Sequence, residues 1–80
     1  GSNIPLARVA GLIARIAEYA IVEFVPKEDP QVQRLLASRK DVFPDYTLEG
    51  FQTAFEGCFE RIGGGPVEDS ARSIWVFRRR

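Results

Sequence analysis

The sequence contains no histidine and a single cysteine, Cys58, among its 80 residues. A lone cysteine cannot form an internal disulfide, and the usual base that activates a thiol nucleophile is missing. The same shortages exclude a zinc site, because such sites are built from several cysteines and histidines. We therefore expect Cys58 to be a small buried apolar residue in a protein of a reducing, cytoplasmic compartment.

Long apolar runs and net charge are also lacking. No run approaches the roughly 20 residues that a membrane span needs, and no segment resembles a signal peptide. Because 11 basic residues balance 11 acidic ones, we expect no general attraction to nucleic acid or anionic lipid. Residues 1–2, Gly-Ser, resemble the remnant of a cleaved expression tag, so we treat residues 3–80 as one small domain.

Three segments have the apolar periodicity of helices. Asn3 can cap the first, and its apolar face is predicted to contain Leu6, Val9, Ile13 and Ile16. Asp29-Pro30 is a typical start for a second, short helix, and Thr47 can cap a third. The third apolar stripe consists of Leu48, Phe51, Phe55 and Phe59. Phenylalanines in this pattern are more typical of a core than of a ligand site.

Three further segments have the pattern of strands. Residues 20–25 form a nearly continuous apolar run, and residues 59–64 and 72–79 are predicted to form a hairpin with a longer loop. The last strand carries large apolar residues on both of its faces, so we expect it to be central in the sheet. The predicted order is helix, strand, helix, helix, strand, strand.

Three motifs each allow a structural and a functional interpretation. Gly63-Gly64-Gly65 could cradle a phosphate, but no helix follows it, which favours a bulge or strand break. Arg78-Arg79-Arg80 could bind nucleic acid, or could form a solvated tail neutralised by the acidic stretch before it. Glu23 interrupts the first strand. It is expected either to pair with an arginine or face solvent at a sheet edge, or to line a ligand cleft.

The remaining candidates lie in two loops. In open α/β sheets ligands bind beyond the carboxyl ends of the strands, and the turn at residues 26–29 occupies such a position. A second loop precedes the third helix, and we expect both loops at the same end of the sheet, as a wall of a cleft. The candidate site residues are Pro26, Lys27, Glu28, Asp29, Phe43 and Tyr46, with Asp45 beside them. Their chemistry does not specify a reaction, and no catalytic residue is predicted.

Short segments along nearly the whole chain together carry a family resemblance. They are Ile4–Ala10, Val22–Pro26, Asp29–Val32, Leu35–Arg39, Phe43–Tyr46, Phe51, Asp69-Ser70 and Ile74–Phe77. This set resembles the C-terminal half of class I S-adenosylmethionine-dependent methyltransferases. That family has a seven-stranded Rossmann-like sheet whose last strand is antiparallel and lies beside the fifth.

The resemblance implies that residues 20–25, 59–64 and 72–79 are the fifth, sixth and seventh strands, with the seventh between the other two. The implied fold class is α/β: a three-layer Rossmann-like fragment with a mixed three-stranded sheet and a central, antiparallel C-terminal strand. The family binds S-adenosylmethionine through a glycine-rich turn and an acid in its N-terminal half, and neither has a counterpart here. We therefore expect no cofactor bound to this chain alone. The part that remains corresponds to the acceptor-substrate side, for a small-molecule or unknown methyl acceptor.

The resemblance also bears on partners. In a complete enzyme a fourth strand would cover the outer side of residues 20–25, so in this chain we expect a tendency to form a homodimer through that edge. An alternative function is a stand-alone, non-enzymatic α/β module that binds a protein through this strand and the Phe43/Tyr46 loop. A third is nucleic-acid binding by the arginine tail.

Overall fold

The computed structural model describes residues 5–36 and 46–80 of the chain. Its elements are α1 (Leu6–Ile16), β1 (Tyr19–Phe24), α2 (Pro30–Leu36), α3 (Leu48–Glu56), β2 (Phe59–Pro66) and β3 (Ser73–Arg79). The predicted order of elements is confirmed, and the strand boundaries differ from the predicted ones by at most two residues. The helix cap expected at Asn3 and the tag remnant lie outside the described residues.

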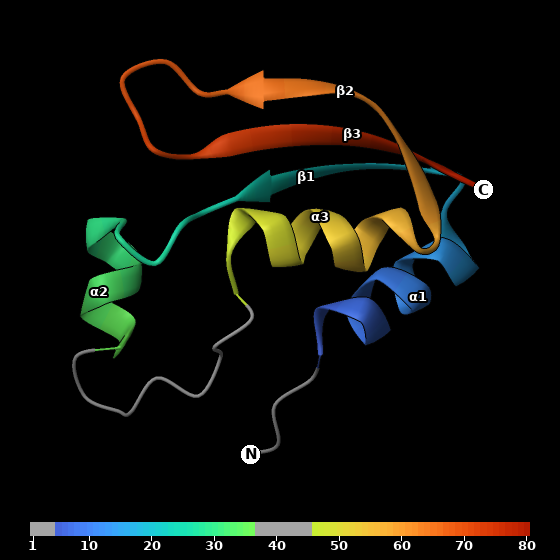
Figure 1. The fold of residues 1–80 in the computed structure, drawn as a ribbon, viewed down its shortest axis with the longest axis horizontal. Helices are drawn as coiled ribbons and strands as arrows, with labels where there is room; N and C mark the ends of the chain where they lie inside the picture. Colours follow the sequence, from blue (N-terminus) through green and yellow to red (C-terminus); the bar gives the residue numbers. More distant parts are fainter. Residues whose placement is uncertain (1–4, 37–45) are drawn as a thin grey trace.

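The three strands form one sheet in the order β1-β3-β2. β3 is therefore central, as the apolar residues on both of its faces predicted. It pairs antiparallel with each neighbour, so β1 and β2 run in the same direction and are not paired with each other (Figure 1). The prediction of a mixed sheet is corrected accordingly, because both pairs of hydrogen-bonded strands are antiparallel.

Helices α1 and α3 lie on one side of this sheet, and α2 lies beyond the end of β1 (Figure 1). Phe24, Phe59 and Phe77 are buried on the side that packs against α1 and α3. On the opposite side Ile21 is 75% exposed and Ile74 is 38% exposed. The described part of the chain therefore has two layers, whereas the family resemblance implied three.

The core is a cluster of aromatic rings between α3 and the sheet. Its buried members are Ala10, Phe24, Phe51, Phe55, Phe59 and Phe77. Ring centroids are 4.9 Å apart for Phe51 and Phe55, and 5.1 Å apart for Phe55 and Phe77. The predicted core role of the three phenylalanines of residues 51–59 is confirmed. Phe59 nevertheless belongs to β2, because α3 ends at Glu56.

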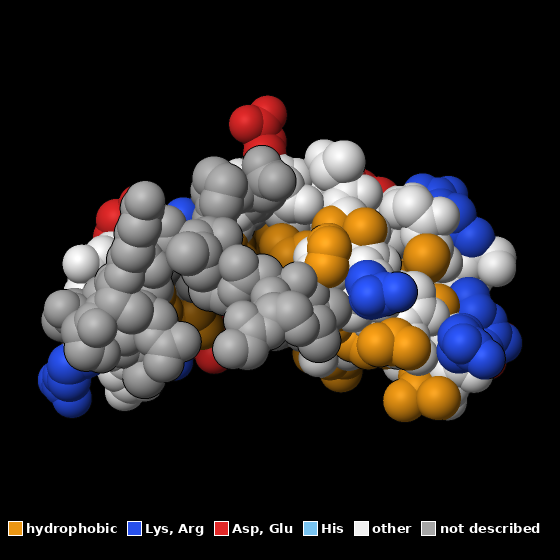
Figure 2. Space-filling view, turned by 90° about the horizontal axis from the view of Figure 1, so that it is seen from below, with side chains coloured by type: hydrophobic (Ala, Val, Ile, Leu, Met, Phe, Trp, Pro, Cys, Tyr) orange, Lys and Arg blue, Asp and Glu red, His pale blue; other side chains and the backbone are white. Residues whose placement is uncertain are grey.

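Two residues of the predicted apolar stripes are exposed. Ile16 is 84% exposed and Leu48 is 40% exposed. In α1 the side that packs on the core consists of Leu6, Ala10, Ile13 and Ala14. Leu12 and Ile16 therefore remain at the surface, and Figure 2, which views the molecule from the helix side, shows hydrophobic side chains exposed there. The sequence indicated an amphipathic helix but placed the centre of its buried face incorrectly.

The glycine run forms an irregular stretch of β2. The register shifts between Arg61 and Gly63, and Gly64 has a φ of 125°. A β-carbon at Gly64 would lie 2.2 Å from the Ile74 carbonyl oxygen, so only glycine fits there. The interpretation as a bulge is confirmed.

The three terminal arginines contact the body of the protein. Arg78 forms an ion pair with Glu60 at 3.1 Å, so the predicted neutralisation by the acidic stretch is observed for this arginine. The Arg79 and Arg80 side chains donate hydrogen bonds to the carbonyl oxygens of Ala14 and Glu56. The tail is exposed but is not free of the fold. Among the described residues, no helix is long and apolar enough to cross a membrane.

Candidate functional site

β1 ends at a turn that leads into α2. The Asp29 N–H donates to the Pro26 carbonyl oxygen at 3.0 Å and closes the turn. Asp29 Oδ1 then accepts a hydrogen bond from the Gln31 N–H at 2.9 Å. This is the N-cap role predicted for Asp29, because the first N–H groups of a helix have no partner within the helix. The turn is fixed at both ends by backbone and side-chain hydrogen bonds.

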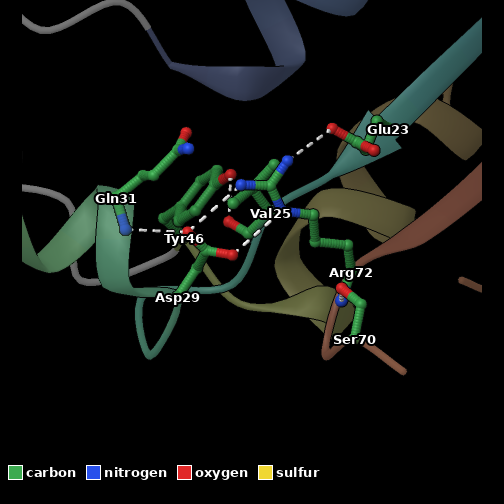
Figure 3. A network of polar contacts seen from close by, with 7 residues as sticks. All are labelled: Glu23, Val25, Asp29, Gln31, Tyr46, Ser70 and Arg72. Carbon is green, nitrogen blue, oxygen red and sulfur yellow. Dashed lines mark hydrogen bonds and ion pairs between the residues drawn. The ribbon is translucent and has the colours of Figure 1, made fainter. Parts of the chain in front are cut away.

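Arg72 joins this turn to the beginning of β3 (Figure 3). Its Nε donates to Asp29 Oδ2 at 2.9 Å and its Nη2 donates to Asp29 Oδ1 at 3.2 Å. Its Nη1 reaches Glu23 Oε1 at a longer 3.5 Å. The Arg72 N–H donates to Ser70 Oγ at 2.9 Å, which orders the segment before the strand. Two-bond pairing of arginine with a carboxylate is the geometrically specific form of this contact.

The electrostatic effect of Arg72 is strongest at Asp29. The hydrogen bonds from Arg72 lower the pKa of the Asp29 carboxyl, and the Gln31 N–H lowers it further. The same pair raises the pKa of Arg72, mainly through its hydrogen bond to Asp29. Asp29 is therefore a carboxylate whose two oxygens already accept hydrogen bonds. An ionised and occupied carboxylate of this kind is suited to holding structure and poorly suited to accepting a proton in catalysis.

Tyr46 packs against the end of β1. Its hydroxyl donates to the Val25 carbonyl oxygen at 2.7 Å, and its ring centroid lies 5.1 Å from that of Phe24. Burial raises the pKa of the Tyr46 phenol, so the side chain stays neutral and remains a donor. Tyr46 therefore lies at the same end of the sheet as the turn at residues 26–29. Phe43 and Asp45 lie outside the described residues.

The other predicted site residues line the turn. Pro26 and Lys27 are partly exposed, and Glu28 is exposed. The Gln33 side-chain amide donates to the Lys27 carbonyl oxygen. Glu23, predicted either to pair with an arginine or to line a cleft, is 43% exposed and contacts Arg72, so the structural interpretation holds.

Sequence reasoning did not assign a role to Arg72 or to the Val25 carbonyl. A signal for Arg72 was present, because it directly precedes the last strand. In an antiparallel pair the start of one strand lies opposite the end of the other, and Ser73 is paired with Phe24. An arginine just before the last strand therefore lies near an acid that follows the first strand. Predicting this contact requires knowing that the two strands pair with each other.

The arrangement supports binding or positioning more readily than bond breaking. Cys58 is partly buried against the core. Within residues 5–36 and 46–80, no group of three or more metal-ligating side chains occurs. The end of β1 presents hydrogen-bonded turn backbone, a neutral phenol at Tyr46 and a carboxylate at Asp29 that is paired with Arg72.

The chain is similar to a curated protein from a bacterium. The chain is 39% identical over 77 residues to the nodulation protein NoeA of Rhizobium meliloti (strain 1021). The match covers 96% of this chain and 16% of that protein, so the chain spans about a sixth of the length of the curated relative. No family model matches the sequence. No solved structure matches it either.

Proposed function

We propose that this chain is the C-terminal, substrate-side part of an S-adenosylmethionine-dependent methyltransferase. The observation that supports this best is the strand order β1-β3-β2, with the last strand antiparallel between two strands of the same direction. The sequence resemblance places this order, fifth-seventh-sixth, at the end of the methyltransferase sheet. Helices α2 and α3 lie between β1 and β2 in the sequence, and a helical connection between two strands of the same direction is typical of α/β proteins.

Within that proposal, the end of β1 forms part of the wall that holds the methyl acceptor. Ligands of open α/β sheets bind beyond the carboxyl ends of strands, where the turn at residues 26–29 and Tyr46 lie. The proposed role of these residues is to shape and orient, since Asp29 is occupied by Arg72. The Tyr46 hydroxyl oxygen keeps lone pairs that can accept a hydrogen bond from an acceptor molecule.

The described residues do not fit as a binding site for the methyl donor itself. A site for a nucleotide-like cofactor needs a glycine-rich turn between a strand and a helix N-terminus. The glycine run here lies inside β2 and leads through Pro66 and a turn into β3. We therefore assign no cofactor contact to this chain, and any binding of S-adenosylmethionine would depend on residues beyond this sequence.

The similarity to the nodulation protein agrees with a role within a longer polypeptide. That protein's name refers to nodulation and specifies no reaction, and the match covers 16% of its length. That the nodulation protein is a methyltransferase is therefore part of the proposal. We also expect this enzyme to be cytoplasmic.

A direct test uses both proteins. Calorimetric titration of the 80-residue chain with S-adenosylmethionine is expected to show no tight binding, whereas the full-length nodulation protein is expected to bind it. Replacing the matched region of the relative with this chain should preserve cofactor binding, and deleting that region should abolish transfer of a radiolabelled methyl group. Failure of the full-length relative to bind S-adenosylmethionine would overturn the proposal, as would tight binding by the 80-residue chain.

The uncovered sheet face supports a second candidate, a non-enzymatic protein-interaction module. Ile21 is 75% exposed and Tyr19 is 55% exposed on that face, and exposed apolar surface often marks a binding site. The same calorimetry separates the two candidates. A relative that binds no S-adenosylmethionine would leave the interaction module as the better explanation of this fold.

A further inference from the structure

The outer edge of β1 carries backbone groups that no described residue binds. The Arg79 N–H donates to the Glu18 carbonyl oxygen at 2.7 Å, which fixes the alternation of the antiparallel ladder. Even-numbered residues of β1 therefore bond to β3, and the N–H and C=O groups of Tyr19, Ile21 and Glu23 point outward. An edge of this kind is a template for pairing with another strand.

The opposite edge of the sheet is not equivalent. β2 has a bulge between Arg61 and Gly63, a left-handed residue at Gly64, and Pro66 as its last residue. Bulges and prolines are the devices by which natural sheets prevent edge-to-edge pairing. β1 consists of YAIVEF, without glycine or proline, and its register with β3 is uninterrupted. β1 is thus the edge that can accept a further strand.

The centre of the uncovered face beside this edge is apolar, with Tyr19 and Glu23 on either side of Ile21 in β1. Ile21 lies next to Val76 of β3, which in turn is opposite Gly63 of β2. Because glycine has no side chain, this row is a flat strip whose most exposed member is Ile21 at 75%. Pairing through β1 would place a second Ile21 directly against the first and extend the strip.

We propose that two copies of this chain pair through β1, antiparallel about a two-fold axis at Ile21. Each copy then exchanges backbone hydrogen bonds through its three outward-pointing residues. Tyr19 lies opposite Glu23 of the second copy, and its neighbour within its own sheet is Arg78. The carboxylate of the second copy thus faces the phenol directly, and Arg78, which also pairs with Glu60 at 3.1 Å, lies one strand further on the same sheet face, which is a complementary arrangement.

Other registers lack this complementarity. Moving the axis to Val22 sets the charged Glu23 opposite Ile21. Moving it to Ala20 carries Glu23 past the end of the facing strand, opposite Ala17. The register at Ile21 alone pairs every outward-pointing group of β1 with an outward-pointing group of the second copy.

This inference does not depend on the methyltransferase proposal, because it concerns the edge of the 80-residue chain. A longer polypeptide that supplies its own strand at β1 would compete with the second copy. Failure of S-adenosylmethionine binding in the relative would leave the dimer untouched, and a monomeric chain would leave the methyltransferase proposal untouched.

The first test compares two edge substitutions by sedimentation equilibrium. Ile21→Lys and Ile62→Lys each replace an exposed isoleucine with lysine, one in β1 and one in the irregular β2. The wild type and Ile62→Lys are expected to dimerise with the same dissociation constant, and Ile21→Lys is expected to raise it by about tenfold or more. A wild-type chain that stays monomeric at about 1 mM would overturn the proposal. So would a dimer that Ile21→Lys does not weaken, which would point to another surface, such as Leu12 and Ile16 of α1.

The second test addresses the register. Tyr19→Glu places a carboxylate opposite Glu23 of the second copy, and Tyr19→Lys places an ammonium there. The expected shifts of the dissociation constant are opposite in sign, about 2- to 30-fold weaker for Tyr19→Glu and about 2- to 30-fold tighter for Tyr19→Lys. Within one chain the order is reversed, because a glutamate beside Arg78 is favourable and a lysine is not. Equal effects on the dimer, or effects that follow monomer stability, would exclude this register.

Hydrogen exchange provides a check that requires no substitution. Raising the protein concentration is expected to slow exchange at the amides of Tyr19, Ile21 and Glu23, whose N–H groups point outward. Ala20 and Val22, which already bond to β3, should change much less. Protection that is independent of concentration at the three outward amides would contradict pairing through β1.

Discussion

The two faces of the sheet are built from neighbouring residues of the same strands but differ in almost every property. Phe77 is 0% exposed and lies within the aromatic core. Val76, its neighbour in sequence, belongs to the face that no described helix covers. The helix face is densely aromatic, whereas the open face combines aliphatic side chains and glycines with Tyr19, Glu23 and Arg78. The difference indicates that folding free energy is concentrated on one face, leaving the other available for binding.

The largest expected effect comes from truncating the buried face. Phe77→Ala removes a fully buried ring that contacts Phe51, Phe55 and Phe59. Such a change costs about 3–5 kcal/mol, which approaches the whole free energy of unfolding of a domain this small. Urea denaturation followed by Trp75 fluorescence measures this loss.

The matched control for that prediction is the neighbouring residue on the open face. Val76→Ala is expected to cost less than about 1 kcal/mol, because it removes partly exposed atoms. Similar losses for Phe77→Ala and Val76→Ala would mean that the open face is covered in solution, for example by a second copy. The comparison should therefore be made at low protein concentration.

The next largest effect is expected from alanine substitutions at two adjacent glycines of β2. Gly64 is opposite Trp75 of the helix face and Gly65 is opposite Ile74 of the open face. Gly64→Ala forces a side chain into a φ of 125° and towards Trp75, whereas a β-carbon at Gly65 meets nothing within 4 Å. We expect Gly64→Ala to cost about 1–3 kcal/mol and Gly65→Ala to change stability little, as measured by thermal denaturation. A larger loss at Gly65 would contradict the description of the open face as free space.

Much of the fold was predictable because it depends on local patterns. Helix caps are an example: Thr47 Oγ1 accepts a hydrogen bond from the Gly50 N–H at 3.0 Å, and Asp29 caps α2 as its position before a proline predicted. The central place of β3 was also predicted, although the reason was only partly right. Apolar residues on both faces indicated burial on both, but one face is open. Apolar residues on both faces of a strand indicate that both faces become covered. The covering surface can belong to a part of the protein, or a partner, outside this chain.

The candidate site was less predictable, since it depends on contacts between distant residues. Asp29 and Arg72 are 43 positions apart, and no local pattern links them. Tyr46 was named as a site residue from its loop, but its hydrogen bond to the Val25 carbonyl is set by the packing of Phe24. The exposure of Ile16 follows from the rotation of α1, which periodicity does not determine when Leu12, Ile13 and Ile16 are all apolar.

A smaller effect distinguishes the two tyrosines. Tyr46→Phe removes the hydroxyl bonded to Val25 at 2.7 Å while keeping the ring contact with Phe24. The partly buried carbonyl would lose its partner, so we expect a loss of about 0.5–1.5 kcal/mol. Tyr19→Phe, on the open face, is expected to change monomer stability by less than that, because Tyr19 is 55% exposed. Chemical denaturation measures both, and equal losses would show that the Tyr46 hydrogen bond adds nothing to stability.

The smallest expected effect is a change in the pH dependence of stability, and it concerns Asp29, the more buried of the two carboxylates that contact Arg72. Asp29 is 10% exposed and bonded at 2.9 Å, whereas Glu23 is 43% exposed at 3.5 Å on the open face. Because the folded-state pKa of Asp29 lies below its unfolded value of about 4, its stabilising contribution is complete above that value. It is lost as pH falls through the lower, folded pKa. Asp29→Asn should therefore flatten the decline in stability below about pH 4. Denaturation of the wild type and of Asp29→Asn at several pH values between neutral and strongly acidic tests this, and an equally steep decline in both proteins would contradict the role of Asp29 as the main partner of Arg72.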